Sequence, residues 1–519
     1  MSEPEPVAVA ALRELIARLV AAGSFGPPAT VATPIETHIS IIVLGEREAW
    51  KFKKPVDLGF LDFSSLSQRE TACAREVELN RRLLPEFYLG VRRIGGTQEA
   101  PRLDALPAIE VCVHMRRFPA GAELPQALTE GRVDAAMIRR LGQELADFQA
   151  DCDAVVTGGG AARALTRQCE DNFTAIQQCA PEARHRIAIG AVAAATRGQL
   201  ARYAGLLDAR QRAGRLRRGH GDLHAGNLLL LDGRVRVFDC IEFSEALRTN
   251  DVLNELAFAL MDFTARGHPG LAAELLDAWL ERCGDYAALP LLPLFIAYRA
   301  MVRAKVAALG EGRDARRQLS EYLALAQAAL RVRPGTLILT HGLSGSGKST
   351  LAATLVGACG AVRVRTDVER RRLLTEQAPG LLGSDAGYTA EWTARTYARV
   401  AAACRQVIAA GRPAIADATF LRRAERQVFV DLGRRLGVAV RILDCQAPEE
   451  VLQARIETRH RHGDDASEAD LRVLRQQQRE RDPLDPGEQA LAVTVDTCQP
   501  PDGAALAARL GLSVLTPQG

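Results

Sequence analysis

Residues 342–349, Gly-Leu-Ser-Gly-Ser-Gly-Lys-Ser, limit the possible folds most strongly, because they match the phosphate-loop pattern G-x-x-x-x-G-K-[ST] in full. The apolar segment TLILTHG precedes them and KSTLAATLVGAC follows, which predicts a strand, a tight loop and a helix. Glycines let the loop backbone approach a phosphate, and the helix N-terminus favours negative charge. We expect nucleotide contacts from Gly342, Ser344, Gly345, Ser346, Gly347, Lys348, Ser349 and Thr350.

Two of these loop residues have more specific expected roles. Lys348 should reach the terminal phosphates and act in catalysis, and the Ser349 hydroxyl should bind Mg²⁺. Further strand-like segments, RPAIADAT and VAVRILDC, alternate with helical patterns after the loop. This alternation predicts an α/β P-loop NTPase domain with a parallel sheet and helices on both faces.

Acidic and basic residues at the expected strand ends are candidates for the rest of this site. Asp367 follows a strand and could accept a proton from an acceptor hydroxyl, while Arg370, one helical turn later, could bind an anionic part of the substrate. Asp417 ends another strand and could bind Mg²⁺ through water or contact the substrate. The alternative interpretation of both aspartates is helix capping.

A later helical segment carries Arg455 and Arg459, which are four residues apart and therefore share a face. Ser467 and Asp470 then have the spacing of a helix start. We interpret this helix–loop–helix as a lid whose arginines contact ATP, with a solvated basic helix as the alternative. The motifs GLSGSGKST, RTDVERRRL and ADATFLRRAER resemble small P-loop kinases of the gluconate-kinase, polynucleotide-kinase and zeta-toxin type, which implies phosphorylation of a hydroxyl on a small molecule or nucleotide.

The first part of the chain has the pattern of a two-lobed α+β domain. The short strand-like segments ISIIVLG, AWKFKK and AIEVCVHM come first, and long helical patterns follow from about residue 132. A helical pattern ends at Pro334-Gly335, directly before the strand of the phosphate loop. We therefore predict two domains, residues 1–333 and 334–519.

The segment HGDLHAGN at residues 220–227 contains Asp222 and Asn227, whose separation is the D-x-x-x-x-N spacing of a kinase catalytic loop. A short hairpin, LLLLDGRVRVFD, should return Asp239 to face Asn227 and bring two metal ligands together. HGDLHAGN followed by FDCIEF resembles the aminoglycoside phosphotransferase and choline kinase branch of the protein-kinase-like fold. That resemblance implies that Asp222 is the catalytic base and that Asn227 and Asp239 bind Mg²⁺.

A kinase site also needs a lysine at the phosphates and a glutamate that pairs with it. Lys51 is the preferred lysine, and Lys53 on the same strand face remains open; Glu76 is preferred over Glu78 as the partner. The strand that ends near Met115 should lead into the hinge that binds adenine. No glycine-rich loop precedes Lys51, so the hydroxyls and amides of the segment around Thr37 and Ser40 are candidates to contact the phosphates instead.

Together the two halves resemble a bacterial family of bifunctional phosphotransferase/ATP-binding proteins, in which an aminoglycoside-phosphotransferase-like domain is fused to a P-loop kinase domain. The resemblance implies ATP and Mg²⁺ as cofactors and small-molecule hydroxyls as acceptors. Three hypotheses follow: a two-site small-molecule kinase, an ATP-binding regulatory protein in which one domain controls the other, and a nucleotide or nucleic-acid end kinase.

Composition limits these alternatives. The net charge of +3 and the 5% aromatic residues argue against a broad nucleic-acid surface. The eleven cysteines form no CxxC pair, which favours free thiols in a reducing compartment. The N-terminal segment lacks the basic and apolar parts of a signal peptide, and no uncharged apolar run is long enough to span a membrane. We therefore expect a cytoplasmic protein without a membrane anchor; the sequence does not indicate its oligomeric state.

Overall fold

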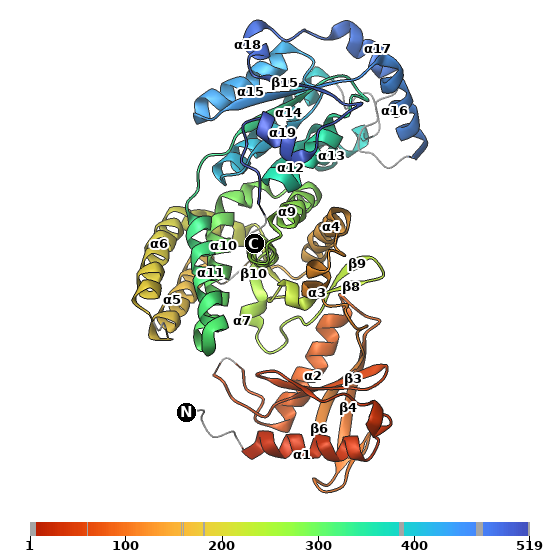
Figure 1. Cartoon of the computed structure of the whole chain (residues 1–519), viewed down its shortest axis with the longest axis vertical. Coiled ribbons are helices and arrows are strands. Elements are labelled where there is room, and N and C mark those ends of the chain that lie inside the picture. Colours follow the sequence, from red (N-terminus) through yellow and green to blue (C-terminus); the bar gives the residue numbers. More distant parts are fainter. Residues whose placement is uncertain are drawn as a thin grey trace. The chain divides into compact units, whose positions relative to one another are not determined.

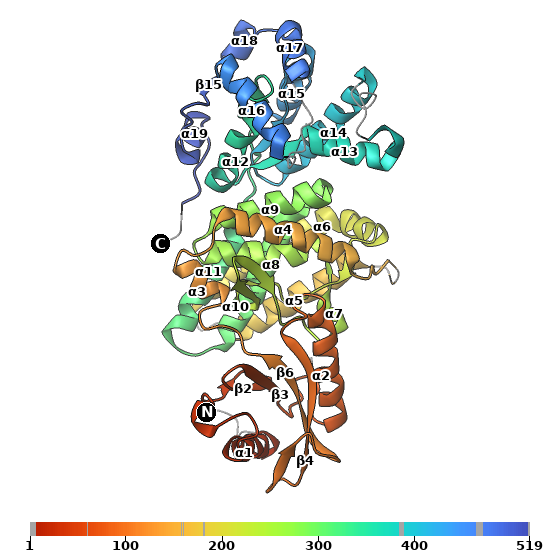
Figure 2. The same ribbon diagram turned by 90° about the vertical axis from the view of Figure 1, so that its right-hand side faces the viewer.

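The computed structural model describes residues 7–516 except positions 60, 157, 159, 180–181, 383–388 and 463–470, and only the backbone at 459–462. The chain forms two compact units. Unit 1 contains Met1–Val133, Cys152–Thr157 and Arg212–Glu255, and unit 2 contains Asp134–Asp151, Gly158–Gln211 and Leu256–Gly519. Both are drawn in Figure 1 and, turned by 90°, in Figure 2.

Unit 1 is built on a six-stranded antiparallel sheet of order β1-β2-β3-β6-β4-β5. Its strands are β1 Ile35–Glu36, β2 Ser40–Leu44, β3 Glu48–Lys53, β4 Tyr88–Gly96, β5 Pro101–Leu103 and β6 Ala108–Arg116. Helix α1 (Val7–Ala21) packs its leucines on one face, and helix α2 (Leu66–Arg81) packs on the other (Figures 1 and 2). A capping box between Ser65 and Gln68 starts α2.

The remaining elements of unit 1 are short. Two antiparallel strand pairs follow the sheet: β7 (Leu216–Arg218) with β10 (Thr249–Asp251), and β8 (Leu228–Leu231) with β9 (Arg234–Val237). The accompanying helices are η1 Pro28–Thr30, α3 Leu124–Thr129, η2 Ala225–Asn227 and α7 Glu245–Arg248. The hairpin predicted around Asp232-Gly233 is confirmed by the β8–β9 pairing.

Unit 2 contains a helical layer and a parallel sheet. The helical layer consists of α4 Ala135–Asp151, α5 Ala161–Cys179, α6 Ala183–Arg212, α8 Val252–Ala265, α9 Pro269–Cys283, η3 Tyr286–Leu291, α10 Leu292–Leu309 and α11 Gly312–Leu330. The window Tyr286–Leu309 is long and apolar enough to cross a membrane, but 78% of it is buried inside the structure, which is typical of a core helix in a soluble protein. All eleven cysteines are free, as expected.

The parallel sheet of unit 2 has the order β12-β13-β11-β14-β15, which confirms the predicted α/β arrangement. Its strands are β11 Leu337–His341, β12 Val362–Arg365, β13 Ala414–Asp417, β14 Val440–Gln446 and β15 Ala492–Asp496. The helices around it are α12 Lys348–Cys359, α13 Thr366–Gln377, η4 Pro379–Leu381, α14 Ala390–Ala409, α15 Arg423–Leu436, α16 Glu449–His462, α17 Leu471–Glu480, α18 Pro486–Gln489 and α19 Gly503–Arg509.

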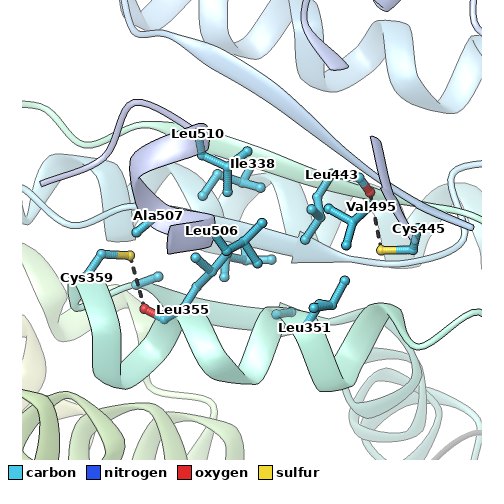
Figure 3. Packing of buried hydrophobic residues seen from close by; sticks show 13 residues of the cluster. Ile338, Leu351, Leu355, Cys359, Leu443, Cys445, Val495, Leu506, Ala507 and Leu510 are labelled. Atoms are coloured by element: carbon cyan, nitrogen blue, oxygen red, sulfur yellow. Dashed lines mark hydrogen bonds between the residues drawn. The ribbon is translucent and has the colours of Figure 1, made fainter. Parts of the chain in front are cut away.

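An apolar core fixes the helix that follows the phosphate loop. Ile338 and Leu443 of the sheet pack against Leu351 and Leu355 of α12 and Leu506 of α19 (Figure 3). Because each of these side chains is almost fully buried, burial of their apolar surface holds α12, and with it the loop, against the sheet.

The compact units do not coincide with the two predicted domains, because helices from the first part of the chain pack with the parallel sheet in unit 2. The helix predicted to end before Pro334-Gly335 does end, at Leu330, and β11 begins at Leu337. The division between residues 333 and 334 falls in this connection and stays a prediction.

Candidate functional sites

Strand β3 directs its two lysines toward α2. Trp50 and Phe52 pack with α1 on the outer face, so the alternating side chains Lys51 and Lys53 point to the opposite face, where α2 presents Glu76. Lys51 Nζ donates to Glu76 Oε1 at 2.9 Å and to Asp239 Oδ1 at 2.6 Å. This geometry favours Lys51 as the phosphate lysine, because it contacts both the helix glutamate and the predicted metal ligand.

Lys53 makes a second, deeper set of ion pairs. Its Nζ contacts the other oxygen of Glu76 and also Glu242 Oε1. Its side chain is 1% exposed, whereas that of Lys51 is 12% exposed, so Lys51 lies nearer the surface of the cluster. Glu78 is exposed on α2 and takes no part in these contacts.

The cluster is strongly charged. Burial alone would lower the pKa of Lys51, but Asp239, Glu76 and Glu242 outweigh it and raise that pKa well above its usual value. Burial would raise the pKa of Glu76, but Lys51 and Lys53 lower it to about 2. Both groups are therefore charged at neutral pH, which is the state a phosphate-binding ion pair requires.

The catalytic-loop motif forms a tight turn with Asp222 and Asn227 side by side. Asn227 Nδ2 donates to the carbonyl of Asp222 at 2.9 Å and to its Oδ2 at 3.1 Å, and His224 Nε2 lies 3.3 Å from the same Oδ2. Glu255 accepts from the amides of His220 and Gly221 and anchors the start of the loop. The loop therefore fixes the direction of the Asp222 carboxylate.

The β8–β9 hairpin returns the chain to this loop, as predicted. The amide of Phe238 donates to the Asn227 carbonyl at 3.1 Å, so the next residue, Asp239, lies beside the catalytic loop. Asp239 has a positive φ of 61°. Its amide donates to the Tyr88 hydroxyl at 3.3 Å, a contact that helps to hold this uncommon backbone conformation.

The donor set fits Mg²⁺ bound to a nucleotide. The Asn227 amide nitrogen is turned toward Asp222, which leaves its side-chain oxygen available, and Asp239 supplies a carboxylate. Within the described residues, no group of three His, Cys, Asp or Glu side chains is arranged to hold a metal. Mg²⁺ characteristically uses one or two carboxylates together with substrate phosphates, so these two side chains would hold it only with ATP present.

Two other predicted contacts are less direct. Met115 is buried in the sheet between Ala49 and Tyr88 on the neighbouring strands, so it lies in the core at the end of β6. Thr37 Oγ1 accepts from the Ser40 amide at 3.0 Å, so these groups close the β1–β2 turn. Contacts of Met115 with adenine, and of Thr37 or Ser40 with phosphates, stay predictions.

The phosphate loop of unit 2 lies between β11 and α12 as expected. Gly342, Gly345 and Gly347 have positive φ values of 140°, 82° and 81°. A Cβ on Gly345 would lie 2.7 Å from the Leu452 carbonyl, so both conformation and space require glycine there. Lys348 Nζ donates to the Leu343 carbonyl at 2.7 Å, across the loop, and Ser349 and Thr350 follow it in the first turn of α12.

Helices α16 and α17 contact this loop directly. Gln477 of α17 accepts from the Ser344 amide at 2.9 Å with its side-chain oxygen, in the manner expected of a phosphate oxygen. Arg455 of α16 donates to the Gly345 carbonyl at 3.3 Å and to Thr497, so its observed contacts support the loop. A contact of Arg455 with phosphate stays a prediction; the Arg459 side chain and the Ser467–Asp470 helix start lie outside the described residues.

The predicted acidic residues of the second site lie at the carboxyl ends of neighbouring strands. Asp417 ends β13 and is buried; Thr340 of β11 lies 3.4 Å from its Oδ1, and its Oδ2 has no hydrogen-bond partner in the described part of the chain. Asp367 and Arg370 lie in the first turns of α13, directly after β12. Arg370 Nη1 contacts Thr393 at 3.4 Å. Parallel α/β sheets bind their ligands at the carboxyl ends of the strands, where these residues lie.

Several residues of both sites were not identified from sequence. The sequence assigns no role to Glu242, Tyr88, Glu255 or Gln477, because each acts through a partner far away in the chain. The positive φ of Asp239 gave no sequence signal either, since positive φ is uncommon outside glycine.

Comparison with known proteins identifies the chain's relatives. The phosphotransferase enzyme family matches residues 110–292, and an AAA domain family matches residues 337–484. Uncharacterized proteins of Mycobacterium bovis and Mycobacterium tuberculosis are 30% identical over 445 residues, which is 83% of this chain and 87% of theirs. The chain belongs to the same family as these mycobacterial proteins. In this chain a kinase-like phosphotransferase fold is followed by an α/β P-loop kinase-like domain, and the protein is a kinase.

Two solved structures are similar to parts of this chain. A gluconokinase from Sinorhizobium meliloti is 24% identical, covering 35% of this chain and 91% of its own with a TM-score of 0.24. A choline/ethanolamine kinase family protein from Mesorhizobium loti is 12% identical, covering 61% of this chain and 95% of its own with a TM-score of 0.38.

Proposed function

We propose that this kinase has two ATP sites and transfers the γ-phosphate of ATP to hydroxyl groups of small molecules, with Mg²⁺ at both sites, in the cytoplasm. The observation that carries the proposal is the position of Lys51, which contacts both Glu76 and Asp239. A nucleotide-binding kinase site needs a lysine paired with a helix glutamate and, beside it, an aspartate for Mg²⁺.

In the first site, the Asp222 carboxylate would accept the proton of an acceptor hydroxyl while the hydroxyl oxygen attacks the γ-phosphorus. The bond from that phosphorus to the bridging oxygen of ADP breaks, and the proton remains on Asp222. His224 and Asn227 hold the carboxylate in the required direction. Mg²⁺, when bound by Asn227 and Asp239, neutralises charge on the phosphates.

In the second site, the loop amides and Lys348 would bind the phosphates, and Ser349 would bind Mg²⁺. Asp367 is the candidate base and Arg370 the candidate ligand for an anionic acceptor. Asp417 is buried and its Oδ2 has no hydrogen-bond partner in the described part of the chain. Because buried polar atoms usually have a partner, this supports a charged or hydrogen-bonding ligand at this position. Such a ligand would be Mg²⁺ with its waters or a group of the acceptor.

The test is ATP turnover by the full chain with a panel of sugars, aminoglycosides, nucleosides and oligonucleotides, in wild type, Asp222→Asn and Lys348→Ala. We expect an acceptor for each site, with turnover reduced by about 10²–10⁴-fold in the matching variant and unchanged in the other. Basal turnover that no acceptor stimulates and neither variant alters would contradict the proposal and favour an ATP-binding regulatory protein. Stimulation by oligonucleotides alone would identify an end kinase instead.

A further inference from the structure

Strand β12 is an edge of the parallel sheet in unit 2, and helix α9 covers it. Edge strands leave backbone groups without strand partners. Here the Arg363 amide donates to Asp277 Oδ1 at 2.8 Å, and the Arg363 carbonyl accepts from the Tyr286 hydroxyl at 3.4 Å. Asp277 lies on α9 and Tyr286 begins η3, so this helical segment completes the edge of the sheet.

Ion pairs strengthen the same contact. Asp277 is fully buried and also accepts from the Arg363 side chain at 2.9 Å and from Arg139 of α4 at 2.8 Å. Burial would raise the pKa of Asp277, but Arg363 and Arg139 lower it, so the carboxylate stays charged. Removal of either partner from such a buried pair leaves an uncompensated charge, which is strongly destabilising.

Glu281, one turn further along α9, reaches the second arginine of β12. Its Oε1 accepts from Arg365 Nη1 at 3.0 Å, and its Oε2 accepts from Arg363 and Arg139, each at 3.2 Å. On its other side, Arg365 Nε lies 3.9 Å from Asp417 Oδ2, which is beyond hydrogen-bond distance. Arg365 therefore lies between two carboxylates, at hydrogen-bond distance from Glu281 and at ion-pair distance from Asp417.

We propose that Glu281 is a positioning residue for the P-loop site: it keeps Arg365 at ion-pair distance from Asp417 and prevents a hydrogen bond between them, which leaves Asp417 Oδ2 available for ligand. This inference rests on the proposed function of that site. Glu281 lies within residues 110–292, the segment matched by the phosphotransferase family, so the helical layer contributes a residue to the P-loop site. Without the Glu281 charge, Arg365 would move toward Asp417 and form a hydrogen bond with its Oδ2.

The kinetic test uses full-length Glu281→Gln, Arg365→Gln, the double variant and the control Glu274→Gln. Glu274 lies on the same helix and pairs with Arg139, but not with β12. We expect Glu281→Gln to lower the Lys348-dependent kcat by about tenfold or more with little change in the KM for ATP, because the loop is untouched. The double variant should recover most of this loss. Equal rates in Glu281→Gln and Glu274→Gln, or a double variant no faster than Glu281→Gln, would overturn the proposal.

A crystallographic test does not depend on activity. In nucleotide-free crystals, Arg365 should form a hydrogen bond with Asp417 in Glu281→Gln and not in wild type. If Arg365 keeps its wild-type position in Glu281→Gln, the inference is wrong. If wild type has no Lys348-dependent turnover, the proposed function of the P-loop site fails, while this structural comparison still decides whether Glu281 controls Arg365.

Discussion

At the scale of single residues, the first site depends on one glutamate shared by two lysines. Glu76 uses one oxygen for Lys51 and the other for Lys53, and Lys53 also holds Glu242. The two lysines are therefore not interchangeable. Lys51 contacts Asp239, the predicted metal ligand, whereas Lys53 compensates Glu242, a carboxylate that is 4% exposed.

Lys51→Met should mainly affect turnover, whereas Lys53→Met should mainly affect stability. Lys51→Met should abolish turnover at the first site with little loss of stability, because Glu76 keeps Lys53 and Asp239 remains accessible to water. Lys53→Met should lower the free energy of unfolding by about 3–5 kcal/mol, because Glu242 loses its buried partner. Urea unfolding and turnover measure the two effects. Adding Glu242→Gln to Lys53→Met should restore part of the stability; similar stability losses in both single variants would refute the distinction.

The lowered pKa of Glu76 predicts that the stability of the protein depends on pH. Because the folded-state pKa of Glu76 is lowered to about 2 from an ordinary value of 4.5, its stabilising contribution is present above pH 4.5 and is lost as the pH falls toward 2. The free energy of unfolding should be measured from pH 5 down to the lowest pH at which the protein is still folded. As the pH falls, this free energy should decrease less steeply in Lys51→Met than in wild type, because the variant lacks one of the two cations that lower the pKa of Glu76. Parallel curves for wild type and variant would contradict this account.

At the scale of elements, α17 blocks part of the phosphate loop. The Gln477 oxygen binds the Ser344 amide, which a phosphate would need, and α17 is held nearby by apolar contacts among Leu474, Leu343 and Leu452. If the loop binds nucleotide as we propose, Gln477 must release this amide first.

Gln477→Ala should raise the affinity of the P-loop site for ATP by about two- to tenfold, because binding no longer breaks a hydrogen bond worth about 0.5–1.5 kcal/mol. Calorimetric titration of ATP into Lys51→Met chains, in which the first site is disabled, measures this affinity alone. Gln476→Ala is the matched control, since Gln476 contacts Glu480 and not the loop. Unchanged or weaker binding by Gln477→Ala would show that Gln477 does not compete with phosphate.

At the scale of the whole molecule, the two proposed ATP sites predict a stoichiometry of two ATP molecules per chain. Wild type should bind two ATP molecules per chain in calorimetry, and Lys51→Met and Lys348→Ala should each bind one. The double variant should bind none, because each lysine belongs to a different site. One ATP in wild type, lost in only one of the single variants, would identify the other site as inactive for nucleotide binding.

Sequence reasoning predicted the local parts of both sites. The phosphate loop, the Asp222–Asn227 pair and the returning hairpin were all found, because each depends on residues close together in the chain. The choice between Lys51 and Lys53 stayed open, since both lie on one face of the same strand. Glu281 gave no signal at all, because its partner Arg365 lies 84 residues away in another predicted domain.

The sequence by itself therefore determined which backbone segments can cradle phosphates and which spacing brings a base next to a metal ligand. Glycine content, residue spacing and strand–helix order act over short stretches and can be read from the printed chain. Only the tertiary structure decided how the buried charges pair, with Glu76 between two lysines and Arg365 between Glu281 and Asp417. The physical reason is that a buried charge needs a close partner, and packing of distant segments determines which one is in reach.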